Sequence, residues 1–286
     1  MRRILAGSAL AMACGLVAHS GCVGVGGDGH SDLREEDELV LGLMEDLGYH
    51  QDDIELADTR IIVDKDLIFF REKLLNGEYA PVTEVDLESD PTEKGYRHPN
   101  AITVNVANIK LAFAAGATTP IKNAFINAAG DINSVANCNV VVSQNNTGPT
   151  ITVREVAAVN WGTTPCAASE PACTTAPSGG NVSTDIYVKA SGIAPGCSAW
   201  SNSAMDFAFR HELLHALGFT HVKQAGSIQV FDSAVCSGTA TTCADMPGYT
   251  TVMKKTLELD SSTCAAQPWI PTILASDDRL TLSILF

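Results

Sequence analysis

Residues 211–221, with the sequence HELLHALGFTH, constrain this chain more than any other stretch, because three of its seven histidines lie there. Positions four residues apart lie on one face of an α-helix, so His211 and His215 can present two imidazole nitrogens to one metal ion. Gly218 is the residue type that ends a helix in a left-handed conformation, and we expect the chain to turn there. This turn would bring His221 back as a third nitrogen ligand.

Three nitrogen ligands from the protein are typical of a catalytic zinc site, because they leave the fourth position of a tetrahedral ion open for water. Glu212 lies beside the first histidine, where its carboxylate can take a proton from that water while the zinc polarises a scissile carbonyl. A lone histidine on a helix is more often a satisfied core or surface residue than a ligand. The three histidines together with Glu212 and Gly218 favour one catalytic Zn²⁺ ion over that alternative.

This H-E-x-x-H-x-x-G-x-x-H pattern resembles the zinc-binding motif of the metzincin clan of zinc endopeptidases. The clan also has a tight turn with a methionine beneath the histidines, which implies that Met253 supports the site. Met246 is the alternative, because Pro247 and Gly248 favour a turn, and either methionine can instead be ordinary core filling. Lys255 stands where astacin-like members of the clan have a tyrosine ligand, so we expect no tyrosine ligand here.

Within the clan, the chain resembles the bacterial HEIGH-type metallopeptidases, although its own core motif reads HELLH. The resemblance also rests on a small N-terminal unit that ends in RIIVDKD at residues 60–66, and on LASDD at residues 274–278. It implies an α/β (α+β) metzincin-like fold for residues 97–286, with a mixed twisted sheet, an edge strand, two long helices and an irregular, disulfide-containing lower subdomain. It further implies that an extended protein or peptide substrate pairs with the edge strand.

The hydrophobic pattern predicts the elements of such a fold. Thr119 and Pro120 begin a helix whose apolar face runs to Val135, and Ser203 is expected to cap the zinc-binding helix over residues 203–217. Strands are predicted at residues 60–63, 67–70, 101–106, 139–142, 151–153 and 185–188, the last being the edge strand. A helix over residues 39–47, a long loop over residues 160–180 and a short final helix from Ser276 complete the prediction.

Acidic side chains are concentrated near the N-terminus. The net charge is −15, and residues 28–93 carry 21 acidic and 5 basic side chains, against 12 and 11 in residues 94–286. No basic stripe exists to neutralise phosphates, so we expect no nucleic-acid partner. We interpret residues 28–93 as either a pro-segment that covers the zinc cleft or a solvated accessory subdomain. They contain no cysteine, so a thiolate of this unit cannot bind the zinc, whereas an aspartate could serve.

Residues 1–22 are typical of an export signal, with Arg2 and Arg3 before an apolar run that is too short to span a bilayer. Cleavage at a small-residue site would release a soluble protein, whereas lipid on Cys22 would attach the protein to a membrane. The other cysteines also favour an oxidising compartment. Each of the pairs Cys166 with Cys173 and Cys236 with Cys243 encloses six residues, so two local disulfides are predicted.

These observations predict an exported, monomeric zinc endopeptidase that acts on protein or peptide substrates. Two alternatives remain open. The first is a non-catalytic binding or adhesion protein of the cell envelope that retains a zinc site, against which the intact Glu212 argues. The second is a zinc hydrolase that acts on non-peptide substrates.

Overall fold

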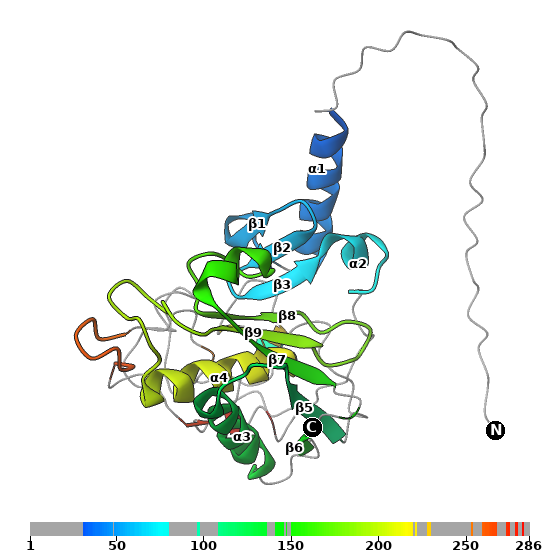
Figure 1. The fold of residues 1–286 in the computed structure, drawn as a ribbon. Helices are drawn as coiled ribbons and strands as arrows, with labels where there is room; N and C mark the ends of the chain where they lie inside the picture. The colour runs from blue at the N-terminus through cyan, green and yellow to red at the C-terminus, as the bar shows by residue number, and fades with distance from the viewer. Residues whose placement is uncertain are drawn as a thin grey trace, which may run out of the picture.

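The computed structural model describes residues 31–47, 49–79, 96–97, 108–135, 141–145, 147, 150–219, 221, 228–229, 253, 259–267, 273–274, 278–279 and 282. Its centre is one sheet of eight strands in the order β1-β2-β3-β8-β9-β7-β5-β6. The N-terminal unit forms one end of this sheet (Figure 1), and the C-terminal part, from residue 97 onward, forms the rest. A separate ladder pairs β4 (Tyr96–Arg97) with β10 (Ile228–Gln229).

Three strands come from the N-terminal unit: β1 (Ile54–Leu56), β2 (Arg60–Val63) and β3 (Leu67–Phe70). They form an antiparallel meander, and β2 and β3 have the bounds predicted from two short apolar runs on either side of a polar turn. Helix α1 (Ser31–Asp46) begins well before its predicted start, and the short helix α2 (Arg71–Leu75) follows β3 directly. Apolar residues of α1 and of the meander form a core of their own, which includes the fully buried side chains of Val40, Met44 and Phe69.

The C-terminal part supplies the other five strands: β5 (Asn108–Phe113), β6 (Val141–Gln144), β7 (Ile151–Val156), β8 (Ala172–Thr175) and β9 (Asp185–Lys189). Strands β5, β6, β7 and β9 run parallel, and β8 is antiparallel to β9. The strand predicted at residues 101–106 lies outside the described residues, as do the first two residues of the one predicted at 139–142.

Two predictions about this region were wrong. Residues 185–188 are not an edge strand, because β9 lies between β7 and β8. Residues 160–180 are not only loop, because they contain β8 and most of the short 3-10 helix η2 (Ala158–Thr163). Strand β8 was missed because its sequence, Ala-Cys-Thr-Thr, has the small residues of a loop, although all four of its side chains are buried.

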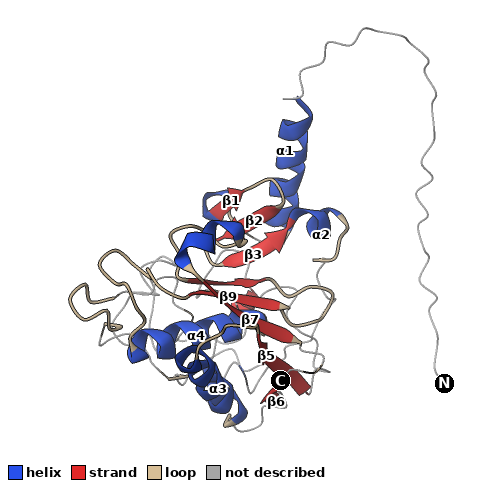
Figure 2. Cartoon of the chain, viewed as in Figure 1, coloured by secondary structure: helices blue, strands red, loops and turns tan. Residues whose placement is uncertain are grey.

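The two long helices, α3 (Thr119–Asn133) and α4 (Asn202–Ala216), lie on the same side of the C-terminal strands (Figure 2). They pack together through Phe125 and Phe209, whose rings are stacked with centroids 4.3 Å apart. Both aromatic side chains are fully buried in a core that α3 and α4 share with the inner face of the sheet. The pattern of apolar positions on α3 predicted this face correctly.

The N-cap of α4 differs from the prediction by two residues. Ser201 caps α4, because its hydroxyl accepts a hydrogen bond from the backbone N–H of Ala204 at 3.2 Å. The hydroxyl of Ser203 instead accepts a hydrogen bond from the backbone N–H of Ala266 at 2.9 Å. The start of α4 is therefore tied to a segment more than sixty positions later in the sequence.

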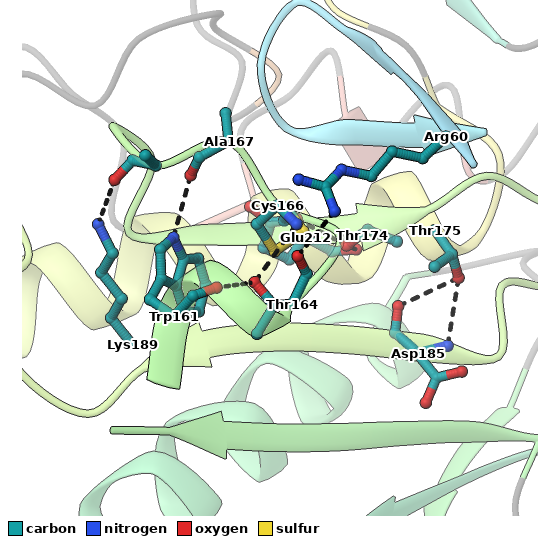
Figure 3. The surroundings of a disulfide bond; sticks show 12 residues. Arg60, Trp161, Thr164, Cys166, Ala167, Thr174, Thr175, Asp185, Lys189 and Glu212 are labelled. Atoms are coloured by element: carbon teal, nitrogen blue, oxygen red, sulfur yellow. Dashed lines mark hydrogen bonds between the residues drawn. A yellow bond between two sulfur atoms is a disulfide. The ribbon is translucent and has the colours of Figure 1, made fainter. Parts of the chain in front are cut away.

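Two disulfide bonds link segments of the C-terminal part. The predicted Cys166–Cys173 bond is present (Figure 3), and it closes the loop just before β8. A second bond, Cys197–Cys264, was not predicted, since its partners are 67 positions apart and local spacing gives no indication of the pairing. Cys236, Cys243 and Ser276 lie outside the described residues. No helix in the described ranges is long and apolar enough to cross a membrane.

Candidate metal centre

The C-terminal end of α4 brings the three predicted histidines together. Gly218 has φ of +99°, a conformation that L side chains rarely adopt, and it ends the helix as the sequence pattern requires. The N–H of Gly218 donates to the carbonyl of His215, and the N–H of Phe219 donates to that of Leu214, which is the Schellman arrangement. Beyond this turn the chain reverses, and His221 lies against the helix end.

The Nε2 atoms of the three histidines converge on one point. The distance from Nε2 of His211 to that of His215 is 3.0 Å, and Nε2 of His221 lies 3.1 Å and 3.2 Å from these two atoms. All three side chains are buried, with at most 4% of any residue exposed. The i, i+4 spacing and the turn at Gly218 therefore produce the local arrangement that the sequence predicts.

A fourth ligand-type group, the carboxylate of Asp66, comes from the N-terminal unit. Its Oδ2 lies 3.2 Å from Nε2 of His211, 3.1 Å from Nε2 of His221 and 3.8 Å from Nε2 of His215. The four ligand atoms all lie within 4.8 Å of one another. Because Asp66 is 145 positions from His211, the sequence indicated only that an aspartate of this unit can serve, not which one.

Hydrogen bonds leave ring nitrogen lone pairs facing this common point. Nδ1 of His215 lies 2.8 Å from the carbonyl oxygen of Phe219, which can only accept, so Nδ1 carries the proton and Nε2 of the neutral ring has a free lone pair. Nδ1 of His221 lies 3.3 Å from Oδ2 of Asp64 and donates to it in the same way. Such backbone or carboxylate partners are typical of histidines that bind metals.

The electrostatics of the cluster favour a positive charge at its centre. Burial, which disfavours a charged ring, and the neighbouring His215 lower the pKa of His211 to about 4. Burial also opposes protonation of His221, but the charge of Asp66 and hydrogen bonds to Asp64 and Asp66 outweigh it and raise its pKa to about 10. In the absence of a metal, a proton on His221 thus supplies the positive charge that the site attracts.

The donor set fits a metal ion. Three imidazoles and one carboxylate are the ligands of a tetrahedral zinc ion. Oδ1 of Asp66 is buried and has no hydrogen-bond partner among the described residues, which is costly unless a cation compensates it. A buried group of Asp66, His211, His215 and His221 can therefore hold a metal ion.

Glu212 lies beside this group with its carboxylate buried. The hydroxyl of Thr174 on β8 lies 2.6 Å from Oε2 of Glu212, to which it donates a hydrogen bond (Figure 3). Burial and the negative charge of Asp66 raise the pKa of Glu212 well above its ordinary value, and the bond from Thr174 opposes this only in part. Thr174 was not predicted as a site residue, because β8 itself was not recognised from the sequence.

Met253 is 3% exposed and belongs to the same hydrophobic core as Leu213 and Leu214 of α4. This placement agrees with a methionine beneath the histidines, and it agrees equally with core filling. The alternative residue, Met246, lies outside the described residues.

The N-terminal unit meets the C-terminal part along β3 and β8, which pair in parallel. The N–H of Thr174 donates to the carbonyl of Asp66 at 2.9 Å, and the N–H of Ala176 donates to that of Ile68 at 2.7 Å. These two bonds occupy the side of β8 that would otherwise be the edge of the C-terminal sheet. The N-terminal unit therefore covers both this strand and the histidine cluster.

Side chains reinforce this joint. Ile62 and Ile68 are paired across β2 and β3, and both pack against Trp161 and the Cys166–Cys173 disulfide. Nη1 of Arg60 donates to the carbonyl of Thr164 at 3.1 Å (Figure 3). The contact between the two parts is therefore apolar at its centre, with hydrogen bonds on either side.

No protein-family model matches this chain, and no curated protein matches its sequence. Among solved structures, a crystal structure of myroilysin is similar to this chain with a TM-score of 0.36 and 11% sequence identity. The match covers 70% of this chain and 92% of the myroilysin chain. High choriolytic enzyme 1, a hatching-enzyme zinc protease from the medaka fish Oryzias latipes, has a TM-score of 0.32 and 14% identity, over 64% and 92%.

Another myroilysin structure has a TM-score of 0.29 and 17% identity, over 46% of this chain and 52% of that chain. This chain thus spans about half of the length of that relative. Because all three scores and identities are low, we rest the functional assignment on the geometry of the site.

Proposed function

We propose that this chain is an exported zinc-dependent endopeptidase. The observation that carries the proposal is the convergence of three histidine Nε2 atoms, 3.0–3.2 Å apart, next to the buried carboxylate of Glu212. His211, His215 and His221 would hold one zinc ion. The metzincin-like motif of residues 211–221 supports the same assignment, and Met253 would support the site from the core that it shares with α4.

When bound, a zinc ion lowers the pKa of a water molecule and polarises the carbonyl of a peptide bond. Glu212 takes a proton from the attacking water and passes it to the leaving nitrogen as the C–N bond breaks. Thr174 holds Oε2 of Glu212 through its hydroxyl hydrogen bond at 2.6 Å, which fixes the direction of the carboxylate.

We further propose that the N-terminal unit keeps the enzyme latent. A catalytic zinc ion needs an open coordination position, and Asp66 lies where a fourth ligand would be. An extended substrate needs a free strand edge, and β3 occupies that of β8. Activity should therefore rise when the N-terminal unit is removed by limited proteolysis. No gain in activity on removal would support the interpretation as an accessory subdomain.

Casein digestion, with and without a chelator and before and after limited proteolysis, tests the activity. The Glu212→Gln variant should bind zinc and cleave nothing, because an amide cannot accept the proton. Glu155→Gln is the matched control, since its amide oxygen can still accept the hydrogen bond that the N–H of Thr118 donates to this side chain. Cleavage that persists with the chelator or in Glu212→Gln would overturn the mechanism.

Zinc binding without cleavage of any protein would instead favour one of the two alternatives, a binding protein or a hydrolase of non-peptide substrates. A panel of ester and amide substrates separates these two, because only the hydrolase turns any of them over.

Export is part of the proposal. The two disulfides of the described residues are consistent with an oxidising compartment. The candidate signal at residues 1–22 and the candidate lipidation site, Cys22, lie outside the described residues. The intact mass of the mature protein reports the N-terminus, any lipid and the number of disulfides together.

A further inference from the structure

We infer that Asp64 is an outer-sphere residue of the metal site, supplied by the N-terminal unit of the same chain, so that metal binding and docking of this unit stabilise each other. The inference rests on the proposed metal site. It adds a positioning role for a residue that does not itself contact the metal. It also makes the stability of the covered form depend on the metal.

The position of Asp64 is fixed by one contact of its side chain and one hydrogen bond of its backbone. Its side chain is only 3% exposed, and its Oδ2 lies 3.3 Å from Nδ1 of His221, whose side chain is equally buried. Its backbone N–H donates to the carbonyl of Asp53 at 2.9 Å. Asp64 and Lys65 have φ of +51° and +77°, and in this left-handed turn between β2 and β3 the carboxylates of Asp64 and Asp66 both reach His221.

His215 and His221 have outer partners that come from different parts of the molecule. His215 is oriented by the carbonyl of Phe219, which belongs to the same helix-ending turn. His221 is oriented by Asp64, which lies 157 positions earlier in the sequence and belongs to the N-terminal unit. When the unit leaves, His215 keeps its partner and His221 loses this one. The position of His221 therefore depends on docking more than that of His215 does.

Linkage makes this dependence reciprocal. If docking of the unit raises the affinity of the site for a metal, the metal raises the stability of docking by the same factor. Loss of an outer-sphere partner typically lowers metal affinity 10- to 100-fold. We therefore expect undocking to weaken metal binding, and chelation to loosen the joint between β3 and β8.

The first experiment uses the full chain with Co²⁺ and Zn²⁺ as probes. Zinc affinity, measured by competition with a chromogenic chelator, should fall roughly 10- to 100-fold in Asp64→Asn, which keeps the shape and the left-handed turn but removes the charge. Asp52→Asn is the control, because it removes one charge from the same unit at a side chain that is 90% exposed. Asp66→Asn should change the visible spectrum of bound Co²⁺, since an inner ligand is exchanged, whereas Asp64→Asn should leave its shape unchanged.

The second experiment needs no substitution. Chelation of the wild-type chain should increase amide hydrogen exchange at Thr174 and Ala176, whose N–H groups donate to β3, and added zinc should reverse the increase. The inference would be overturned if Asp64→Asn had the wild-type zinc affinity, or if the amide exchange rates of Thr174 and Ala176 did not change with the metal. Neither result would contradict the zinc site itself. A wild-type chain that binds no zinc would instead overturn the proposed function.

Discussion

Replacing Ile68 by alanine should loosen the N-terminal unit from the C-terminal part. Ile68 is fully buried, and its side chain packs across the joint against Trp161 and the Cys166–Cys173 disulfide. Truncation of a buried isoleucine to alanine costs about 2–5 kcal/mol, because apolar contacts are lost and a cavity remains. At about 1.4 kcal/mol for each factor of ten, the undocked population should rise about 30-fold to several thousand-fold.

Amide hydrogen exchange measures this rise in the undocked population directly. The N–H groups of Thr174 and Ala176 donate to β3, so they exchange when the joint opens, and their rates should rise by the same factor. Ile126→Ala is the control, since the same truncation on α3 affects a side chain that is 37% exposed. The reasoning fails if the two amides keep their wild-type rates in Ile68→Ala, or if Ile126→Ala accelerates them equally.

Two further predictions concern pH and the turn at the metal site. Burial raises the pKa of Tyr79 to about 12 from an ordinary 10.0, so its neutral form is stabilised by folding; this contribution is complete below pH 10 and is lost as the pH rises from 10 toward 12. The free energy of unfolding of the N-terminal unit, measured with urea, should therefore fall by about 1–1.5 kcal/mol between pH 9 and pH 11 on account of Tyr79. Tyr79→Phe should remove this part of the fall and leave the part due to Tyr49, whose pKa burial also raises. Gly218→Ala should lower zinc affinity and reduce the free energy of unfolding by about 1–2 kcal/mol, seen as a lower thermal midpoint, because a left-handed φ of +99° suits glycine. Gly130→Ala in α3, where a new Cβ meets nothing within 4 Å, should instead raise the midpoint. Equal midpoints for the two variants would contradict this account of the turn.

Local chemistry explains what the sequence could predict. The spacing of His211, His215 and Gly218 determines a helix face and its end within one stretch, so the cluster followed from residue identities alone. Strands β2 and β3 have clear hydrophobic patterns, and Cys166 and Cys173 lie close enough to suggest their bond.

Long-range pairing explains what the sequence could not predict. Asp64 and Asp66 reach the site across about 150 positions, and nothing in their neighbourhood indicates which histidine they meet. The pairing of β3 with β8, which removes the free edge, likewise depends on the fold as a whole. The N-cap of α4 is Ser201 rather than the predicted Ser203, whose hydroxyl instead accepts a hydrogen bond from Ala266 in a distant segment.

X-ray absorption fine structure at the zinc edge of the purified full-length chain tests the central claim most directly. We predict one zinc ion per chain, bound by three imidazole nitrogens and one carboxylate oxygen at about 2.0–2.2 Å. Zinc with sulfur ligands at about 2.3 Å, zinc with fewer than three imidazoles, or a chain without stoichiometric zinc would contradict the account.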